Sequence, residues 1–119
     1  AATPPQAPPI EAVGAALDAV GEVFAGRRER SRVRQSVIRS HAELRERELI
    51  KLARLSDALA AAFGARGMGE PAASLTAEAI IAVFRVGFVR WVETEDDSEL
   101  GDHLRESLAE LREVTRECR

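Results

Sequence analysis

The sequence contains no tyrosine, one cysteine and one lysine, and aromatic residues make up only 4% of its 119 residues. Its five prolines stand at positions 4, 5, 8, 9 and 71, so residues 10–70 and 72–119 lack the residue that most strongly breaks helices. No stretch shows the alternating β-branched pattern of a strand. These absences argue against a sheet-based domain, and the sequence predicts an all-α fold.

Other absences restrict the class of protein. The single cysteine, Cys118, cannot form an intrachain disulfide, which indicates a reducing compartment. We find no apolar run of about 18 residues and no signal peptide, and we therefore expect a cytoplasmic protein without a membrane partner. The net charge is −3, so the chain lacks the basic excess with which proteins grip nucleic-acid phosphates.

The beginning of the chain differs in composition from the rest. The segment AATPPQAPP is rich in proline and does not start with methionine. Such a composition is typical of a linker. We expect residues 1–9 to connect a missing upstream domain to residues 10–119, which are long enough to form one helical domain with its own core.

Apolar residues at spacings of three and four predict five helices. The first three are expected at about 10–25, 27–39 and 41–66. Gly14 and Gly21 lie on one flank of the first helix, where another helix can approach closely. Ser40 and Glu43 form the pattern of a capping box, which predicts a break between the second and third helices. The third helix is expected to turn these residues inward: Leu49, Leu52, Leu55, Ser56, Leu59 and Phe63.

The fourth predicted helix, residues 71–92, has two apolar faces where a surface helix needs only one. The bulky face consists of Ile80, Ile81, Phe84, Phe88 and Trp91. The opposite face has the spacing of a helix–helix seam and consists of Leu75, Ala79, Ala82, Val86 and Val89. We expect the bulky face to fill the core of the subunit and the seam to pack on a second copy of the chain.

The last predicted helix begins at Asp96 or Asp97, either of which can cap it. Its apolar side is expected to extend the dimer interface through Leu104, Leu108 and Leu111.

The candidates for catalysis and metal binding are few. Neither His41 nor His103 has a glutamate three residues before it, so the motif of helical di-metal sites is missing. There is no nucleophile elbow and no glycine-rich phosphate loop, although a Ser–His–Asp arrangement stays open at this point. We predict no enzyme, no metal and no cofactor.

Two further features allow either a purely structural or a functional interpretation. The basic run 27–34 holds five arginines against one glutamate, and we favour a solvated helix face over contact with DNA. The aromatic residues form either plain core or the wall of an apolar cavity. For Arg85, a salt bridge is favoured over a role in that cavity. A ligand pocket would be lined by Phe24, Gln35, Ile38, His41, Leu59, Phe84, Arg85 and Phe88.

One long segment resembles a known family. The run RSHAELRERELIKLARLSDALAAAFGARGMGEPAASLTAEAIIAVFRVGFVRWV is similar to the C-terminal domain of TetR-type bacterial transcriptional regulators, and most similar to the actinobacterial branch of the mycofactocin-system regulator. The shared features are the ELRERE start, the long Leu/Ala helix, the glycine-rich turn and the A-V-F-R-x-x-F-x-R-W segment. The sequence departs from relatives at Ala42, where they often have proline.

The resemblance implies a homodimer in which the last two helices of each subunit form an intersubunit four-helix bundle. It also implies a helix-turn-helix domain, absent from this sequence, that binds operator DNA, and a core that senses a small apolar effector, as in a repressor. Two rivals stay open: a helical protein–protein adaptor, which dimerises without a pocket, and a helical enzyme, which needs titratable groups converging in a cleft.

Overall fold

The computed structural model describes residues 9–116, which form five helices and, within that range, no strand. The helices are α1 (Pro9–Val23), α2 (Arg28–Ser40), α3 (Ala42–Ala65), α4 (Ala72–Glu93) and α5 (Leu100–Val114). The all-α prediction and the number of helices are confirmed. The predicted linker falls almost wholly outside the described residues, and only its last residue, Pro9, is seen to open α1.

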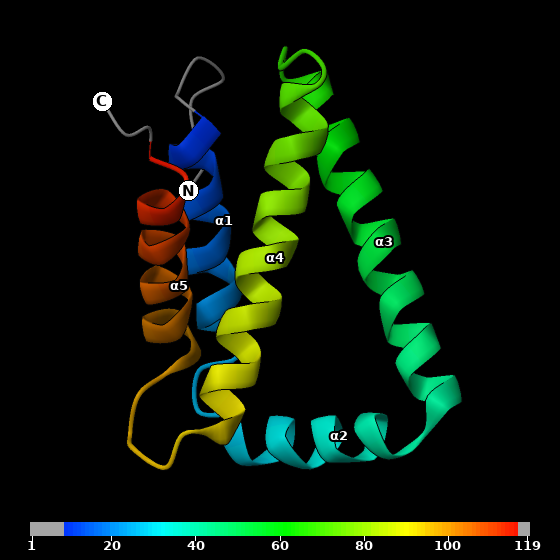
Figure 1. Cartoon of the computed structure of the whole chain (residues 1–119), viewed down its shortest axis with the longest axis vertical. Coiled ribbons are helices and arrows are strands. Elements are labelled where there is room, and N and C mark those ends of the chain that lie inside the picture. The colour runs from blue at the N-terminus through cyan, green and yellow to red at the C-terminus, as the bar shows by residue number, and fades with distance from the viewer. Residues whose placement is uncertain (1–8, 117–119) are drawn as a thin grey trace.

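The central helix is α4, which contacts all four of the others. Helices α1 and α5 run alongside it, while α3 meets it near the turn at residues 66–71 and diverges from it toward the other end (Figure 1). Helix α2 spans the open end between α4 and α3, so that these three helices outline a triangle (Figure 1). Every other helix therefore packs against α4, while α1 also packs against α5 and α2 against α3.

The core forms on one side of α4. The residues on its bulky face are buried, except Phe84, which is half-buried. Trp91, Leu17, Leu100 and Leu104 are the largest side chains that are fully buried, and they come from α4, α1 and α5. Since truncating a buried Phe or Trp to Ala costs about 3–5 kcal/mol, the bulky face contributes strongly to the stability of the fold.

The first half of α3 is more exposed than the sequence predicts. Ser56 and Phe63 are buried as expected, but Leu49 and Leu55 keep 52% and 47% of their surface exposed. Leu49 is exposed where α3 diverges from α4 toward its N-terminal end (Figure 1). Leu55 precedes the buried Ser56 and lies about 100° further around the helix, away from the buried side. The inward-facing prediction was therefore wrong for these two leucines.

The break between α2 and α3 lies where it was predicted, but the capping box does not form. The Ser40 hydroxyl donates to the Ser36 carbonyl at 2.8 Å, back into its own helix. The residue at the N-cap of α3 is His41, whose extended backbone (φ −130°, ψ 119°) produces the corner. Serine hydroxyls bond readily to the carbonyl four residues earlier in a helix. The capping-box pattern of Ser40 and Glu43 does not take this competing contact into account.

The start of α5 also differs from the prediction. The N-cap is Glu99 rather than Asp96 or Asp97, and the Asp102 carboxylate accepts a hydrogen bond from the Glu99 N–H at 2.9 Å. Asp96 instead accepts from the Ser98 N–H at 2.9 Å and so shapes the preceding turn. Aspartate favours such turns as strongly as it favours helix caps.

By length and composition, α4 also meets the criteria for a membrane span, contrary to our expectation from the sequence. Within its most apolar window, 44% of the residues are buried inside the protein. A core helix that also has an apolar outer face passes the same test, and the packing of α4 against four other helices accounts for its composition.

Helices α1 and α5 approach closely at Gly21 and Gly101, which confirms the predicted close approach at Gly21 but not at Gly14. A Cβ placed on Gly21 would lie 2.9 Å from the Cα of Gly101 and 3.2 Å from its nitrogen. Both atoms belong to the backbone, so neither can move without moving α5. A Cβ on Gly14 would lie 3.9 Å from Leu108 Cδ2, which is an ordinary contact.

We therefore expect opposite effects from Gly21→Ala and Gly14→Ala. At position 14 the gain in helix propensity stabilises the fold by up to about 1 kcal/mol. At position 21 the same gain is outweighed by overpacking, which costs about 1–3 kcal/mol. Urea unfolding followed by circular dichroism measures both, and equal stabilisation by the two alanines would contradict the close crossing.

Candidate functional site

The outer face of α4 is apolar and exposed. Leu75 keeps 65% and Val86 56% of its surface exposed, and Ala82 is exposed between them. Ala79 and Val89 are half-buried. These five residues, the predicted seam, lie on the side of α4 opposite its bulky buried face. Exposed apolar side chains that gather in a row in this way are typical of interaction surfaces.

A groove between α4 and α5 continues from this seam. It has a volume of about 420 Å³. Its lining residues come from both helices and are Ala82, Val83, Val86, Arg90, Glu106, Ser107, Glu110, Leu111 and Val114. Val114 is 69% exposed and extends the apolar surface onto the last turn of α5. The seam of α4 and this wall of α5 together form one surface, which we call the α4–α5 face.

The three leucines that were predicted for the interface on α5 have different positions. Leu111 lines the groove, and Leu108 is half-buried against the core. Leu104 is fully buried within its own subunit, so the prediction that it contacts a partner is corrected. The core stripe of α5 passes through Leu100 and Leu104, whereas its exposed wall passes through Ser107, Glu110 and Val114.

An ion pair lies at the edge of the groove. Arg90 Nη2 of α4 is 3.5 Å from Glu106 Oε1 of α5, and the two side chains are 60% and 65% exposed. An exposed pair of this kind contributes about 0–1 kcal/mol to stability. Glu110, one helical turn further along α5, adds a second carboxylate to the same wall.

The aromatic residues form a packed cluster. The Phe24 ring lies 6.2, 5.8 and 6.2 Å from the rings of Phe84, Phe88 and Trp91, measured between centroids. Phe84 and Phe88 are 5.4 Å apart. Most of these contacts are tilted or edge-to-face, the geometry that aromatic pairs prefer. Three of the predicted pocket residues, Phe24, Phe84 and Phe88, are therefore brought together, with Trp91 as a fourth member.

The other predicted pocket residues differ in exposure and in the element that carries them. Leu59 of α3 is half-buried and packs against the same core, and Ile38 of α2 is buried. His41 is exposed at the corner between α2 and α3, where its Nδ1 lies 3.0 Å from the Val37 carbonyl. Arg85 is exposed on α4, and no salt bridge involving it occurs within residues 9–116.

Gln35 lines a second groove, between α2 and the C-terminal end of α4. The other lining residues are Arg32, Ser36, Arg39, Ser40, Val92, Glu93 and Glu95. This groove lies beside the triangle of α2, α3 and α4, and its polar lining contrasts with the apolar α4–α5 face. The predicted polar handles Gln35, His41 and Arg85 thus lie on three different elements rather than around one cavity.

Arginines attach α2 to the end of α4, a role that the sequence did not reveal. Arg32 Nε donates to the Val92 carbonyl at 2.7 Å, and its Nη2 donates to the Thr94 carbonyl at 2.8 Å. These are carbonyls that the helix leaves unpaired at its C-terminus. Arg28 Nη1 donates to the Ser98 carbonyl at 3.4 Å. Arginines of the basic run 27–34 therefore hold α2 against the end of α4, which is a structural role and not a contact with DNA.

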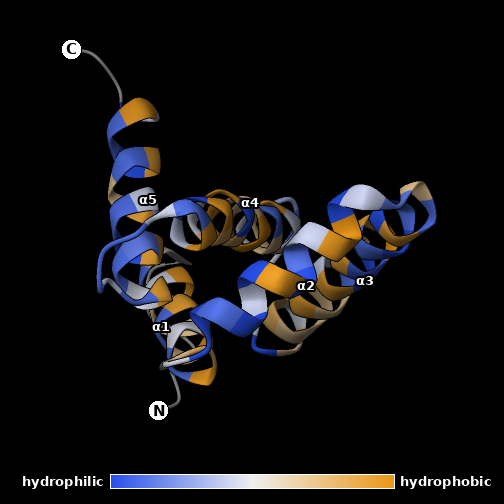
Figure 2. Ribbon diagram, turned by 90° about the horizontal axis from the view of Figure 1, so that it is seen from below, coloured by the Kyte–Doolittle hydropathy of each residue, from blue (hydrophilic) through white to orange (hydrophobic). Residues whose placement is uncertain are grey.

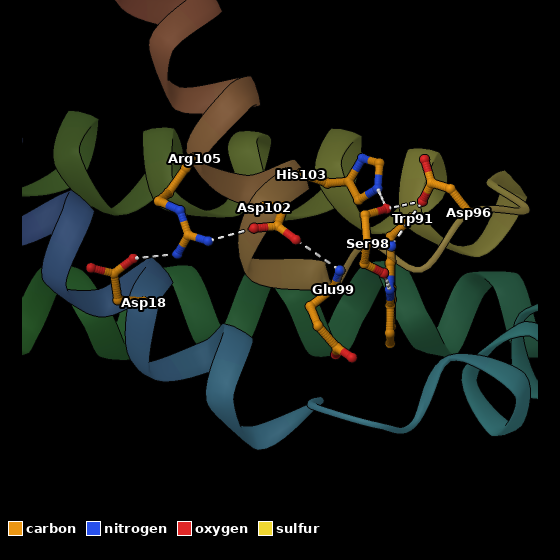
Figure 3. A network of polar contacts seen from close by, with 8 residues as sticks. All are labelled: Asp18, Trp91, Asp96, Ser98, Glu99, Asp102, His103 and Arg105. Atoms are coloured by element: carbon orange, nitrogen blue, oxygen red, sulfur yellow. Dashed lines mark hydrogen bonds and ion pairs between the residues drawn. The ribbon is translucent and has the colours of Figure 1, made fainter.

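A polar network surrounds the turn before α5 (Figure 3). Ser98 Oγ lies 2.7 Å from His103 Nε2, and it also donates to the Asp96 carboxylate. Asp96 therefore contacts the serine and not the histidine, so this trio lacks the aspartate–histidine contact that orients the base in a catalytic triad. Within the described part of the chain, no three His, Cys, Asp or Glu residues are grouped to hold a metal ion.

Two carboxyl groups of this network have lowered pKa values. The hydroxyl and N–H of Ser98 donate to Asp96 and hold its pKa below the ordinary value. For Asp102, the Glu99 N–H lowers the pKa first, and Arg105 Nη2, which is 2.7 Å from Oδ1, lowers it further. Arg105 also reaches Asp18 of α1 at 3.5 Å, so that the start of α5 is linked to α1 (Figure 3).

Comparison with known families agrees with this architecture. The model of the family described as the MftR C-terminal domain, a TetR-type regulator family, matches residues 7–116. The chain belongs to this family, whose members are regulatory domains and not enzymes. It is thus the C-terminal domain of a TetR-type regulator of the mycofactocin-regulator-like branch. No curated protein matches the chain.

The lowered pKa of Asp102 predicts how stability depends on pH. A group whose pKa is lower in the folded state stabilises the fold above its unfolded-state pKa, near 3.8, and this contribution is lost as the pH falls through the folded-state pKa. Asp102→Asn should therefore be less stable than the wild type near neutral pH, and the two should converge on acidification. Urea unfolding at stepped pH measures the difference, with the neighbouring Asp97→Asn as control. A difference that stays constant with pH would contradict the assignment.

Proposed function

We propose that this chain is the effector-sensing and dimerisation domain of a cytoplasmic TetR-type repressor. Two copies pair through their α4–α5 faces into a four-helix bundle, and a helix-turn-helix domain upstream in the full protein binds operator DNA. The single observation that supports this proposal best is the continuity of the exposed α4 seam with the α4–α5 groove. Family membership supplies the regulatory context.

Dimerisation follows from the two-faced character of α4. The bulky face is already buried in the subunit, whereas Leu75 and Val86 of the seam stay exposed to water. Covering it with a second copy removes apolar surface from water at about 25 cal/mol per Å². Small residues at Ala79 and Ala82 allow the partner's helix to approach closely, while Leu75, Val86 and Val114 supply the larger contacts.

The effector site is proposed beside the aromatic cluster, between α4 and the α2–α3 arm. Phe24, Phe84 and Phe88 provide an apolar wall, and Leu59 of α3 packs against the same core. The buried Ile38 is proposed to extend this wall on α2. Gln35 on α2, His41 at the corner between α2 and α3, and Arg85 on α4 are proposed as its polar groups. A small apolar effector that prefers one position of α2 and α3 shifts the population of subunit arrangements, and thereby changes the spacing of the DNA-binding heads.

Val86→Glu should break the dimer. The substitution places a carboxylate at the centre of the apolar seam, on the same wall as Glu106 and Glu110, and pairing would remove it from water at a cost in free energy. We expect the dimer dissociation constant to rise at least tenfold, measured by light scattering over a dilution series. Val33→Glu is the matched control because Val33 is exposed to a similar extent, 58% against 56% for Val86, but lies on α2. Full dimerisation of the Val86 variant would contradict the proposed interface.

Native mass spectrometry of the purified chain tests the sensor role directly. We expect the mass of a dimer together with a small apolar molecule that is released on mild activation. An empty dimer that also binds no compound from an apolar metabolite library would favour the adaptor, which pairs but senses nothing. A monomer at micromolar concentration would contradict the dimerisation domain itself.

A further inference from the structure

The wall of the α4–α5 groove combines apolar side chains with a small set of charges of both signs. Its floor and sides include Val83, Val86, Leu111 and Val114, and its charged groups are Arg90, Glu106 and Glu110. An apolar groove alone would accept any apolar helix. The charges are placed where a covering partner would have to match them.

We propose that Arg90 and Glu106 determine which partner the face accepts, and that the partner they select is a second copy of this chain. This inference rests on the proposed homodimer and adds the residues that give it specificity. In a two-fold interface each residue lies opposite the same surface of the partner. A wall that bears both an arginine and glutamates can complement itself, because the partner's carboxylates can face Arg90 and the partner's arginine can face Glu106.

The geometry within one subunit supports an intersubunit role for the pair. The separation of 3.5 Å between Arg90 and Glu106 is long for a charge-assisted hydrogen bond, and both side chains are more than half exposed. Such a pair stabilises a single subunit very little. Glu110 lies on the same wall, and no salt bridge involving it occurs within residues 9–116. The wall thus presents one cation and two carboxylates, and a partner's arginine would find an acceptor there.

A partner with the wrong charges would be rejected. Like charges placed opposite each other in an interface from which water is excluded are strongly unfavourable, and this effect suppresses wrong pairings more than it strengthens right ones. A related domain with the same apolar seam but with an acidic residue at the position of Arg90 would set that carboxylate against the two carboxylates of this wall, Glu106 and Glu110. Selectivity therefore resides in the charges, whereas the apolar seam supplies affinity.

Two complementary variants test the inference, Arg90→Glu and Glu106→Arg. The first leaves only carboxylates on the wall, and the second sets two arginines beside Glu110. We expect each alone to dimerise at least tenfold more weakly than the wild type. Mixed together, they should form a heterodimer, because the acidic wall of one chain then faces the basic wall of the other. Native mass spectrometry separates the two homodimers from the heterodimer by mass.

The controls separate pairing from folding. Lys51→Glu on α3 makes the same change of charge away from the face and should dimerise normally, and circular dichroism checks that every variant stays helical. If either reversal unfolds, Arg90→Gln and Glu106→Gln replace it, and each should weaken the dimer by a smaller factor.

The outcomes distinguish this inference from the proposed function. Weak homodimers together with a restored heterodimer would support it. If the variants are weakened but mixing does not restore pairing, the clash lies within one subunit and the inference is overturned. If both variants dimerise like the wild type, the inference is overturned while the homodimer stands. A wild-type chain that is monomeric throughout would overturn the proposed dimer instead.

Discussion

The structure depends on one constraint: α4 has two apolar faces, and a single subunit buries only one of them. Its bulky face is buried against α1, α3 and α5, and Trp91 lies fully buried in the middle of the core. Burying one face turns the other outward, so Leu75 and Val86 stay exposed because the core is complete without them. Seen along the molecule from below, α4 lies between the α1–α5 pair and the α2–α3 arm, and apolar segments occur on several sides of its helix (Figure 2).

The two halves of the molecule around α4 are held by different forces. Helices α1 and α5 pack closely, through the backbone contact of Gly21 with Gly101 and through buried leucines. Helix α2 has only two buried residues, Ser31 and Ile38, and is attached largely through arginine side chains to the end of α4. A helix held mainly by side-chain hydrogen bonds, with few buried apolar contacts, moves at a lower free-energy cost than a helix held by close packing. This difference suits an arrangement in which α2 and α3 respond while α4 and α5 pair.

The sequence predicted those features that depend on periodicity. The five helices, the buried stripe of α4 and the approach at Gly21 all follow from the spacing of side chains along a helix. The prediction failed for the helix caps, where one side chain can make either of two competing local hydrogen bonds. Ser40 bonds to Ser36 rather than capping α3, and Asp96 shapes a turn rather than capping α5. Such choices differ by small free energies and leave no pattern in the sequence.

The residues of the α4–α5 face were also predicted only in part from the sequence. The α4 seam was visible because its residues follow a simple spacing, whereas the α5 wall was missed because Glu106, Ser107 and Glu110 are polar and look like an ordinary solvated face. Leu104 was assigned to the interface because it is apolar, yet it completes the core. Which stripe of an amphipathic helix faces its own subunit is fixed by how the helix is rotated against its neighbours. On α5 the buried Leu100 and Leu104 face the core, with Leu104 close to Gly87 of α4, and in this rotation Ser107 and Glu110 line the groove.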